Sequence, residues 1–495
     1  MRKERFVKLL SLCLAFVLLI ATEGSVTALA DGLPYDTYNY DYRQYIHFCP
    51  AAYVPEKAIT GDSLTMDGES IGKFNNPQDF CIDAEGRVYI ADTNNNRIVI
   101  LNSEMTEVEH IIKTFKNGEK EDKFNQPYGV AVSEKGYLYV ADSRNRRVVV
   151  LDDTDTVVQI IDNPQSESLE EGFIFTPLKV TVDYADRVYV IAQNMFEGIM
   201  VFESDGNFSC FFGTISVQIS LWEKFWKRIA TKEERSNQKL YIPTEFTGID
   251  IDPEGFVYAT NIDGTGLQGV RRLNPRGEDV IKKGANENVG GDLQIQGDTE
   301  YAGASQFTDI VYRDNGIYSC LDRKRGRIFT YDYEGNLLYI FGGLGTQEGT
   351  FTMPVAVEEK EGRILVLDST RANILSFTVT EYGDLINNAV ALRYDGDEAE
   401  AVALWERVLE LDENNELANT GIGKAYLTAG DYTKALHYLE LGMSRDYYSI
   451  AYKRYRNEIM MENADWFLTL AAVLVVAGLT VKIIRKRRKG AADDE

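Results

Sequence analysis

Short apolar runs separated by polar turns recur at a fixed spacing along the first three quarters of the chain. Residues 74–101 read FNNPQDFCIDAEGRVYIADTNNNRIVIL and residues 124–151 read FNQPYGVAVSEKGYLYVADSRNRRVVVL, so Pro77 and Pro127 open matching segments. A third copy opens at Pro177. Each copy has a β-rich run, a polar turn and a second run such as VYIAD, and the first two add a third run such as RIVIL. Such a repeat predicts one supersecondary unit per copy.

Weaker copies extend the pattern to six units. Residues 246–273, 307–332 and 351–377 carry the same order of runs without all of its marker residues, and a fourth run often follows, as in residues 336–342. Four short strands per unit, at roughly forty to fifty residues per unit, are typical of a β-propeller blade. The sequence therefore predicts an all-β six-bladed propeller over residues 45–380.

The order of Pro, a V-Y-V-A-D strand and N-x-R resembles the NHL repeat, a family of six-bladed propellers. The resemblance covers residues 45–380, and its first two copies are the most specific. We expect residues 53–55 to supply an outer strand that closes the ring with the last blade, because an open ring leaves two exposed sheet edges. The Asp at the end of the second run and the Arg that follows are interpreted as structural: the Asp caps the turn, and the Arg bonds it or a neighbouring blade.

Function is expected where the repeat lapses and at the loops leading into each blade, because these loops meet on one face of a propeller. They offer hydroxyls, amides and mixed charge, which suit a polar ligand or a protein tail. The candidate ligand-binding residues of this funnel are Gln78, Asp79, Tyr128, Lys179, Gln193, Asn194, Thr247, Asn261 and Asp309.

An insertion at residues 219–240 interrupts the pattern between the third and fourth units. Trp222, Phe225 and Trp226 follow helical spacing and form an aromatic stripe. Three interpretations stay open: a stripe packed against the propeller, a lid over the funnel, or a contact with a membrane or a partner.

After residue 380 the composition changes from β-rich to Ala, Leu and Glu. Gly396-Asp397 and Ala401 recur as Gly430-Asp431 and Ala435, a period of thirty-four residues. The period resembles a tetratricopeptide repeat (TPR), with about two copies over residues 383–450. The resemblance implies an α-helical hairpin region that either binds peptides or proteins, or spaces the propeller from a membrane.

The sequence at both ends of the chain predicts segments that interact with a membrane. Residues 1–30 have a basic start, a short apolar run and an Ala-Leu-Ala site, as in a cleaved signal peptide. Residues 465–484 are long and apolar enough for one transmembrane helix, and the basic tail 485–495 predicts a cytoplasmic C-terminus. We expect a single-pass protein of the cell membrane with an extracytoplasmic body, which resembles a Gram-positive bacterial surface protein.

The net charge of -25 disfavours nucleic acid and anionic lipid as partners. Cys49, Cys81, Cys210 and Cys320 lie far apart without metal-type spacing, so buried thiols or a single disulfide both stay open. No metal site and no cofactor are predicted.

The candidate chemistry is correspondingly sparse. The chain has three histidines, of which His110 falls in an outer strand and His437 in the helical region, so the channel zinc site of some related lyases cannot be assembled. A calcium-dependent lactonase-like hydrolase using Glu245, Asn261 and Asp309 remains an alternative.

The expected function is therefore that of a non-enzymatic, membrane-anchored binding or scaffold protein, accessory to a transporter or to envelope assembly. Its propeller would bind a protein partner or a polar, glycan-like ligand. A surface adhesin is the third alternative, alongside the hydrolase.

Overall fold

The computed structural model describes residues 32–164, 169, 172–214, 245–263, 268–284, 289–292 and 302–492. The predicted signal peptide, and the insertion with Trp222, Phe225 and Trp226, lie outside the described residues. The chain divides into two compact units, residues 1–394 and 395–495.

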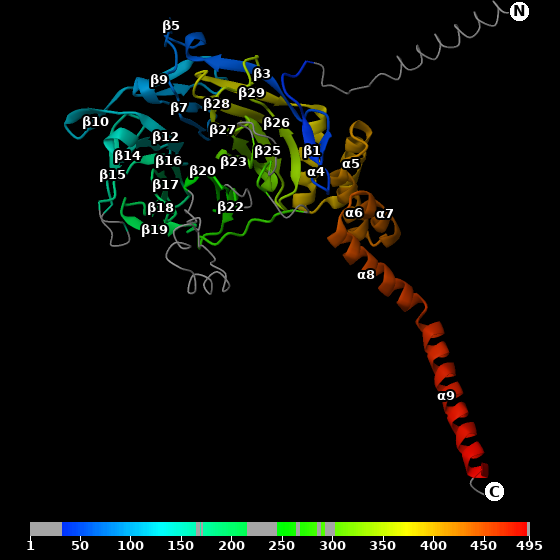
Figure 1. Cartoon of the computed structure of the whole chain (residues 1–495). Coiled ribbons are helices and arrows are strands. Elements are labelled where there is room, and N and C mark those ends of the chain that lie inside the picture. The colour runs from blue at the N-terminus through cyan, green and yellow to red at the C-terminus, as the bar shows by residue number, and fades with distance from the viewer. Residues whose placement is uncertain are drawn as a thin grey trace, which may run out of the picture. The chain divides into compact units, whose positions relative to one another are not determined.

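The first unit is a six-bladed β-propeller, as predicted. Within the described residues, five of its sheets have four antiparallel strands and the fourth sheet has three. In Figure 1 the inner strands gather around one centre, with β9, β15 and β19 toward the rim. From the inner to the outer strand, the first blade is β6 (Asp79–Ile82), β7 (Val88–Asp92), β8 (Arg97–Leu101) and β9 (Val108–Ile112), and the second is β12 (Pro127–Val132), β13 (Leu138–Asp142), β14 (Arg147–Leu151) and β15 (Val157–Ile161). The third blade is β16 (Pro177–Val182), β17 (Val188–Ala192), β18 (Ile199–Phe202) and β19 (Phe208–Phe212), and the fourth is β20 (Phe246–Ile251), β21 (Val257–Asn261) and β22 (Val270–Leu273). The fifth blade is β23 (Phe307–Tyr312), β24 (Tyr318–Asp322), β25 (Arg327–Tyr331) and β26 (Leu337–Phe341), and the sixth is β27 (Pro354–Lys360), β28 (Arg363–Asp368), β29 (Asn373–Val379) and β3 (Tyr53–Thr60).

The last blade closes the ring as expected, with a strand from the beginning of the chain. Strand β3 pairs antiparallel with β29 from Tyr53 opposite Val379 to Thr60 opposite Asn373. The buried guanidinium of Arg313 donates to the hydroxyl of Tyr53 at 2.7 Å and to that of Tyr339 at 2.8 Å. The ring is therefore closed by a β-ladder, and a buried polar contact joins the closing strand β3 to the fifth blade.

The blades pack through both faces of their sheets, which explains why the second strand reads VYIAD rather than alternating apolar and polar. In β7, Val88 and Ile90 belong to the core shared with the last blade, whereas Tyr89 and Ala91 belong to the core shared with the second blade. All four side chains are buried. Each large apolar side chain buried in this way contributes about 1.5–3 kcal/mol, so the β-branched run fixes the blade between its neighbours.

The repeated Asp at the end of the second strand has the structural role that the sequence predicts. Asp92 accepts hydrogen bonds from the backbone N of Asn75 at 2.7 Å and from Arg97 Nε at 2.7 Å. Asp142 repeats both contacts, with Asn125 N at 2.7 Å and Arg147 Nε at 2.9 Å. The Asp thus ties the second strand to the segment that leads into its own blade.

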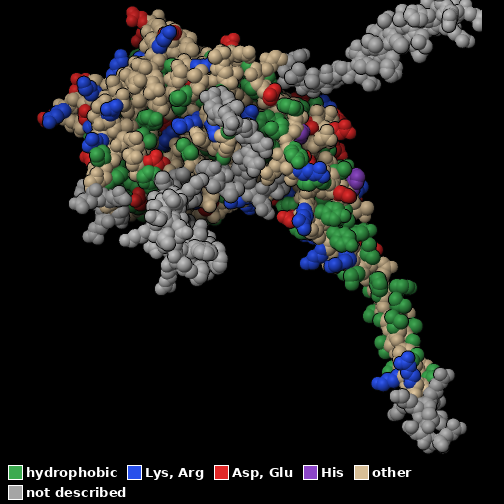
Figure 2. All heavy atoms as spheres, in the orientation of Figure 1, with side chains coloured by type: hydrophobic (Ala, Val, Ile, Leu, Met, Phe, Trp, Pro, Cys, Tyr) green, Lys and Arg blue, Asp and Glu red, His purple; other side chains and the backbone are tan. Residues whose placement is uncertain are grey.

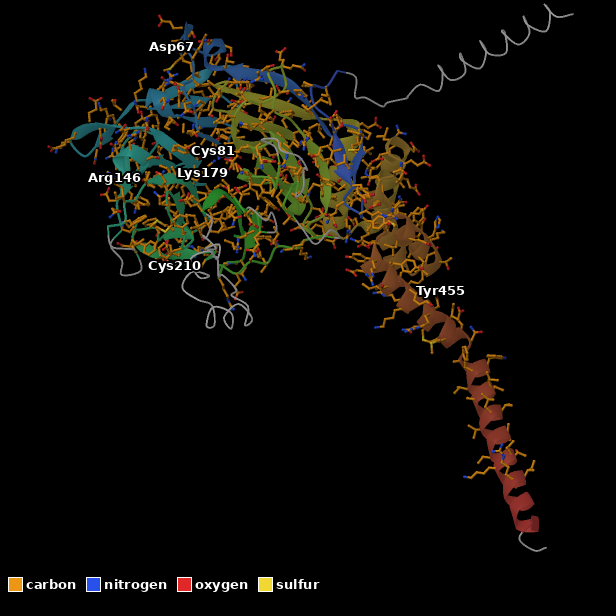
Figure 3. The ribbon with its side chains drawn as sticks, in the orientation of Figure 1. Asp67, Cys81, Arg146, Lys179, Cys210 and Tyr455 are labelled. Carbon is orange, nitrogen blue, oxygen red and sulfur yellow. The ribbon has the colours of Figure 1, made fainter. Side chains whose placement is uncertain are left out.

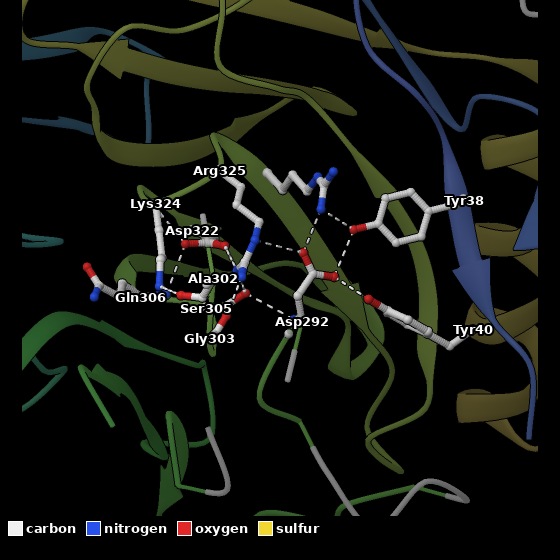
Figure 4. Close-up of polar contacts among 12 residues, drawn as sticks. Tyr38, Tyr40, Asp292, Ala302, Gly303, Ser305, Gln306, Asp322, Lys324 and Arg325 are labelled. Atoms are coloured by element: carbon white, nitrogen blue, oxygen red, sulfur yellow. Dashed lines mark hydrogen bonds and ion pairs between the residues drawn. The ribbon is translucent and has the colours of Figure 1, made fainter. Parts of the chain in front are cut away.

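In the fifth blade the Arg that follows the second strand binds a different carboxylate, that of the buried Asp292, and not the Asp that ends the strand. Asp292 accepts from Arg327 Nη1 at 2.6 Å, and its other oxygen accepts from the hydroxyls of Tyr38 at 2.8 Å and Tyr40 at 2.5 Å. Arg325 takes the place next to Asp322, at 3.3 Å, as Figure 4 shows. The network attaches the hairpin of β1 (Tyr38–Tyr40) and β2 (Ile46–Phe48) to the fifth blade. Further short elements of the unit are β4 (Thr65–Met66), β5 (Glu69–Ser70), β10 (Thr114–Asn117), β11 (Lys120–Lys123) and the 3-10 helices η1 (Gly61–Ser63), η2 (Thr93–Asn95), η3 (Ser143–Asn145) and η4 (Asp314–Gly316).

A helical region of six helices follows the last strand, and its first helix is held to the propeller. Asn387 of this helix, α4 (Glu381–Asp395), accepts from the Tyr339 hydroxyl at 2.6 Å, and Arg393 pairs with Glu334 at 2.9 Å. The predicted boundary at residue 383 therefore falls inside a helix that belongs almost wholly to the first unit. The other helices are α5 (Glu398–Leu411), α6 (Glu416–Ala429), α7 (Tyr432–Leu441), α8 (Arg445–Glu462) and α9 (Ala464–Ala492).

The second unit packs α5, α6, α7 and α8 in sequence. Asn415 and Asp431 cap α6 and α7 through their side chains, and Gly430 ends α6 in the left-handed conformation. The TPR-like assignment stays a prediction. Residues Ala464–Arg485 of α9 are long and apolar enough to cross a membrane, and Figure 2 shows hydrophobic side chains along this helix with Lys and Arg near its end.

Candidate functional site

The site is built from one position that recurs in all six inner strands. This position is the second residue after the repeated Pro, or after Phe246 and Phe307 where the Pro is absent, and a β-bulge marks it in five of the blades. In blade order the residues are Asp79, Gly129, Lys179, Gly248, Asp309 and Ala356. Alternate blades therefore supply charged side chains, and the blades between them supply Gly or Ala.

The three charged side chains meet in one ion cluster, which we call the axial cluster. Lys179 Nζ lies 2.5 Å from Asp79 Oδ1 and 3.2 Å from Asp309 Oδ1. The three side chains are between 6% and 9% exposed. Because they come from the first, third and fifth blades, their contacts join the inner strands across the centre of the ring (Figure 3).

Each carboxylate of the axial cluster also holds its neighbouring blade. The second oxygen of Asp79 accepts from the backbone N of Val130 at 3.1 Å, and that of Asp309 accepts from Val357 N at 3.0 Å. One oxygen thus faces Lys179 while the other faces the inner strand of the next blade. These contacts compensate both carboxylates for their burial.

The small residues between the charges are required by the close approach of the inner strands. A Cβ on Gly129 would lie 2.6 Å from the carbonyl oxygen of Leu178, which is backbone of the third blade. A Cβ on Gly248 would lie 2.5 Å from Asp309 Cα and 2.7 Å from Asp309 Oδ1. Both distances are shorter than real Cβ contacts, so neither glycine tolerates a side chain without movement of the next blade.

Burial and mutual charge set the protonation of the axial cluster. Burial lowers the pKa of Lys179, but the charges of Asp309 and Asp79 outweigh it and hold the pKa above its usual range. Burial raises the pKa of Asp309 to about 6, against the opposing effect of Lys179, and raises that of Asp79 in the same way. The lysine is therefore charged at neutral pH, and the carboxyls are easier to protonate than on the surface.

Further along the same inner strands the axis is acidic. Asp250 accepts from the backbone N of Tyr312 at 2.6 Å, and burial raises its pKa to about 7. Burial also raises the pKa of Glu358 well above its usual range, and the charges of Asp250 and Asp309 raise it further. Among the described residues, no group of three or more His, Cys, Asp or Glu is placed to hold a metal ion.

The nine predicted funnel residues divide into those near the axis and those engaged locally. Asp79, Lys179 and Asp309 form the axial cluster, and Tyr128 lies close enough for the charges of Lys179 and Asp79 to affect its pKa. Asp79, Lys179 and Asp309 are bound to one another, and a role of these four residues in binding a ligand stays a prediction.

The other five residues have local surroundings. Gln78 donates to Asn76 Oδ1 at 2.9 Å, and Thr247 contacts the hydroxyl of Thr260 at 2.9 Å. Asn261 is buried at the end of β21. Gln193 and Asn194 are the exposed members, in the loop between β17 and β18.

Several residues of the site escaped sequence reasoning. Gly129, Gly248 and Ala356 make room for the cluster, and Asp250 and Glu358 extend it. The signal was present, because aligning the second residue after the repeated Pro gives the series D-G-K-G-D-A. Only ring closure shows that alternate members of this series meet.

The proposed hydrolase residues do not form an isolated acidic set. Asp309 is engaged by Lys179 and by Val357 N. Glu245 lies just ahead of β20, and Asn261 lies opposite Phe246 in the antiparallel strand β21, with its backbone N bonded to Gly269 O at 3.0 Å. Among the described residues, Cys49, Cys81, Cys210 and Cys320 form no disulfide.

Comparison with known proteins supports the repeat. The NHL repeat matches residues 74–101 and 124–151. No curated protein matches the sequence. Among solved structures, the chain is similar to virginiamycin B lyase from Staphylococcus aureus, at 11% identity and a TM-score of 0.39, covering 62% of this chain and 97% of that one. It is also similar to Kuenenia stuttgartiensis hydrazine synthase, at 11% identity and a TM-score of 0.41, covering 67% and 85%. A gluconolactonase-like protein matches at 14% identity and a TM-score of 0.38, covering 66% and 94%. The chain thus contains two NHL repeats within a six-bladed β-propeller.

Proposed function

We propose that this protein is a non-enzymatic, membrane-anchored binding or scaffold protein whose propeller faces the outside of the cell. In this proposal α9 crosses the membrane, the helices before it serve as spacer or partner-binding elements, and the protein assists a transporter or envelope assembly. The apolar stretch Ala464–Arg485 and the basic residues that follow support the anchor.

The axial cluster is the observation that carries the binding role. Its carboxylates and its lysine satisfy one another and the backbone of adjacent blades, so they are structural rather than poised as acid, base or nucleophile. In this proposal the ligand meets the surface above the cluster, on the side where the inner strands begin. We call this surface the mouth; it consists of Tyr128 and the described parts of the loops between second and third strands, at residues 93–96, 143–146, 193–198, 262–263, 268–269, 323–326 and 369–372.

Site-specific photo-crosslinking in cells tests the proposal. A photoreactive residue at Asn194 probes the mouth, and one at Tyr184 is the matched control, because both side chains are exposed but flank β17 at opposite ends. We expect Asn194 to give a discrete adduct with a membrane protein or an envelope glycan, and Tyr184 to give none.

Other outcomes contradict the proposal in distinct ways. Adducts from Tyr184 alone would move the binding surface to the opposite face. A lack of adducts at both positions would remove the scaffold role, and adducts only with other cells would favour the adhesin. Calcium-dependent hydrolysis of a lactone panel that Asn261→Ala abolishes would replace binding by catalysis.

A further inference from the structure

Helix α8 loses its packing partners halfway along its length, shortly before the predicted membrane span. In its first half Ala451 is fully buried in the core of the helical unit. Beyond Ala451, Tyr455 and Glu458 are partly buried and every other residue of the helix is exposed. Within the described residues, the second half of α8 is therefore a free surface.

One face of this second half combines aromatic, basic and apolar side chains. Tyr452 is followed by Lys453, Arg456, Ile459 and Met460 at steps of one, four, seven and eight residues, which place all five on one side of a helix. We call this set the juxtamembrane face. Tyr452 is 50% exposed and Met460 is 54% exposed, and Figure 2 shows Lys and Arg side chains beside hydrophobic ones along this helix. Large side chains left uncovered next to a predicted span indicate a contact surface.

The acidic side chains of this half lie on the other side of the helix. Glu458 and Glu462 follow the packed Ala451 by seven and eleven residues, so these three share one side. No ion pair engages Lys453 or Arg456 within the described residues. The two cations therefore set the local field of the juxtamembrane face. The net charge of -25 does not decide it, because exposed charges are screened beyond about 10 Å.

The juxtamembrane face is continuous with the predicted span in α9. This helix begins at Ala464, and Asn463 between the two helices leaves helical geometry, with φ -105° and ψ 16°. The side-chain amide of Asn463 donates to Ile459 O at 2.8 Å, the same carbonyl that its backbone N bonds at 3.1 Å. A side chain that competes for a helix carbonyl is a common cause of a bend.

The distance along the chain decides what this bend has to achieve. Ten residues separate Arg456 from Trp466, which opens the apolar stretch, and they span about 15 Å along a straight helix. The headgroup layer on each side of a bilayer is only about 5–8 Å thick. A contact between Arg456 and the headgroups therefore requires α8 to incline toward the membrane at Asn463.

We propose that the juxtamembrane face lies on the membrane surface at the N-terminal end of the span and binds anionic phospholipid headgroups through Lys453 and Arg456. Ile459 and Met460 reach the boundary with the acyl chains, and Tyr452 lies at headgroup level, where Tyr is enriched. The long stems of Lys and Arg carry their charges to the phosphates. This assignment rests on the membrane anchor of the proposed function and adds the class of lipid that the protein recognises.

Photo-crosslinking of the full chain in nanodiscs tests the assignment. The discs contain equal amounts of zwitterionic phosphatidylcholine and anionic phosphatidylglycerol, and a photoreactive phenylalanine derivative replaces Tyr452. Mass spectrometry of the adducts gives the ratio of anionic to zwitterionic lipid beside α8. We expect this ratio to exceed that of the disc severalfold and to fall as the salt concentration rises.

Substitutions on α8 separate the juxtamembrane face from general charge. Lys453→Gln and Arg456→Gln should each lower the enrichment up to about fivefold, the contribution of one basic residue near an anionic surface, and together should return it to the disc ratio. Arg454→Gln is the matched control. It removes the same charge from an exposed neighbouring position, but Arg454 lies two residues after Tyr452 and so on the other side of the helix. Its enrichment should be nearly unchanged, and circular dichroism of all variants should match the wild type.

A second probe separates this assignment from the anchor on which it rests. Val473 is exposed within the apolar stretch of α9 and should give lipid adducts wherever α9 crosses the bilayer. Lipid adducts at Val473 with none at Tyr452, or adducts at Tyr452 in the disc ratio, overturn the headgroup assignment and leave the anchor standing. A lack of lipid adducts at both positions removes the anchor as well. Equal losses in Arg454→Gln and Arg456→Gln overturn the assignment to this face, and adducts between two copies of the chain at Tyr452 replace it by self-association.

Discussion

Replacing Lys179 by Met is the most direct test of the axial cluster. Methionine keeps the length and the apolar packing of the side chain but removes its charge and its hydrogen bonds to Asp79 and Asp309. The two carboxylates, 6% and 7% exposed, then lack their shared cation and keep only contacts to the backbone. Removing one partner of a buried ion pair costs about 3–5 kcal/mol, so we expect a loss of that size at pH 8.

The pH dependence of this loss distinguishes an ionic cause from a packing defect. Lys179 lowers the pKa of both carboxyls, so its removal raises their folded-state pKa further above the unfolded value. The stability that such groups contribute is present below the unfolded pKa and is lost as the pH rises through the folded pKa. Because the pKa of Asp309 is already about 6, one carboxyl is largely neutral at pH 5, and about half of the loss should remain there.

Thermal unfolding of the full chain, followed by the β-sheet signal in circular dichroism, measures the effect. We expect the melting temperature to fall by roughly 5 °C at pH 8, from the entropy of unfolding a propeller of this size. Adding Asp79→Asn and Asp309→Asn to Lys179→Met should recover much of the loss, since each amide can still accept from the backbone N. Lys135→Met, at an exposed ion pair with Asp186, is the matched control and should not change stability. A loss below about 1 kcal/mol, or one equal at pH 5 and pH 8, would refute the ionic cluster.

Three further predictions concern the fold. Gly129→Ala should destabilise the propeller by about 1–3 kcal/mol in urea unfolding, because its Cβ meets the backbone of the third blade. Asp92→Ala should cost about 2–4 kcal/mol, and less when Arg97→Met accompanies it, because the buried guanidinium is then no longer unpaired; additive losses would contradict this coupling. Burial raises the pKa of Asp250 to about 7, so this group's stabilising effect is lost as the pH rises from about 4 through 7. Melting should therefore be higher at pH 5 than at pH 8 even in high salt, which screens surface repulsion but not the buried group.

The blades were predictable from the sequence because each strand follows a local rule. Val88 to Ala91 are all apolar since both faces of β7 are buried, and Asp92 and Arg97 interact over five residues. Such short-range contacts repeat with the sequence period, so they can be recognised in a single sequence. The closing strand could also be predicted, because an open sheet edge needs a partner strand.

The pairing inside the site was not predictable in the same way. Lys179 is one hundred residues from Asp79 in the chain, and its contact with Asp309 also depends on the closed ring. Sequence reasoning identified all three as polar and placed them on the funnel, but assigned their charges to a ligand. It also passed over Gly129, because an absent side chain has meaning only when the neighbouring strand is known.

The order of charges around the axis is constrained by more than their mutual attraction. If attraction alone mattered, exchanging Asp79 and Lys179 would preserve one ion pair. The exchange would, however, set an ammonium against the backbone N of Val130, where two donors would face each other without an acceptor. A carboxylate therefore suits the first and fifth blades, where the next inner strand donates an N–H to it, and the cation is left to the third blade. The axial charges are therefore engaged in holding the blades together, and in the proposed function a ligand is recognised by side chains above them.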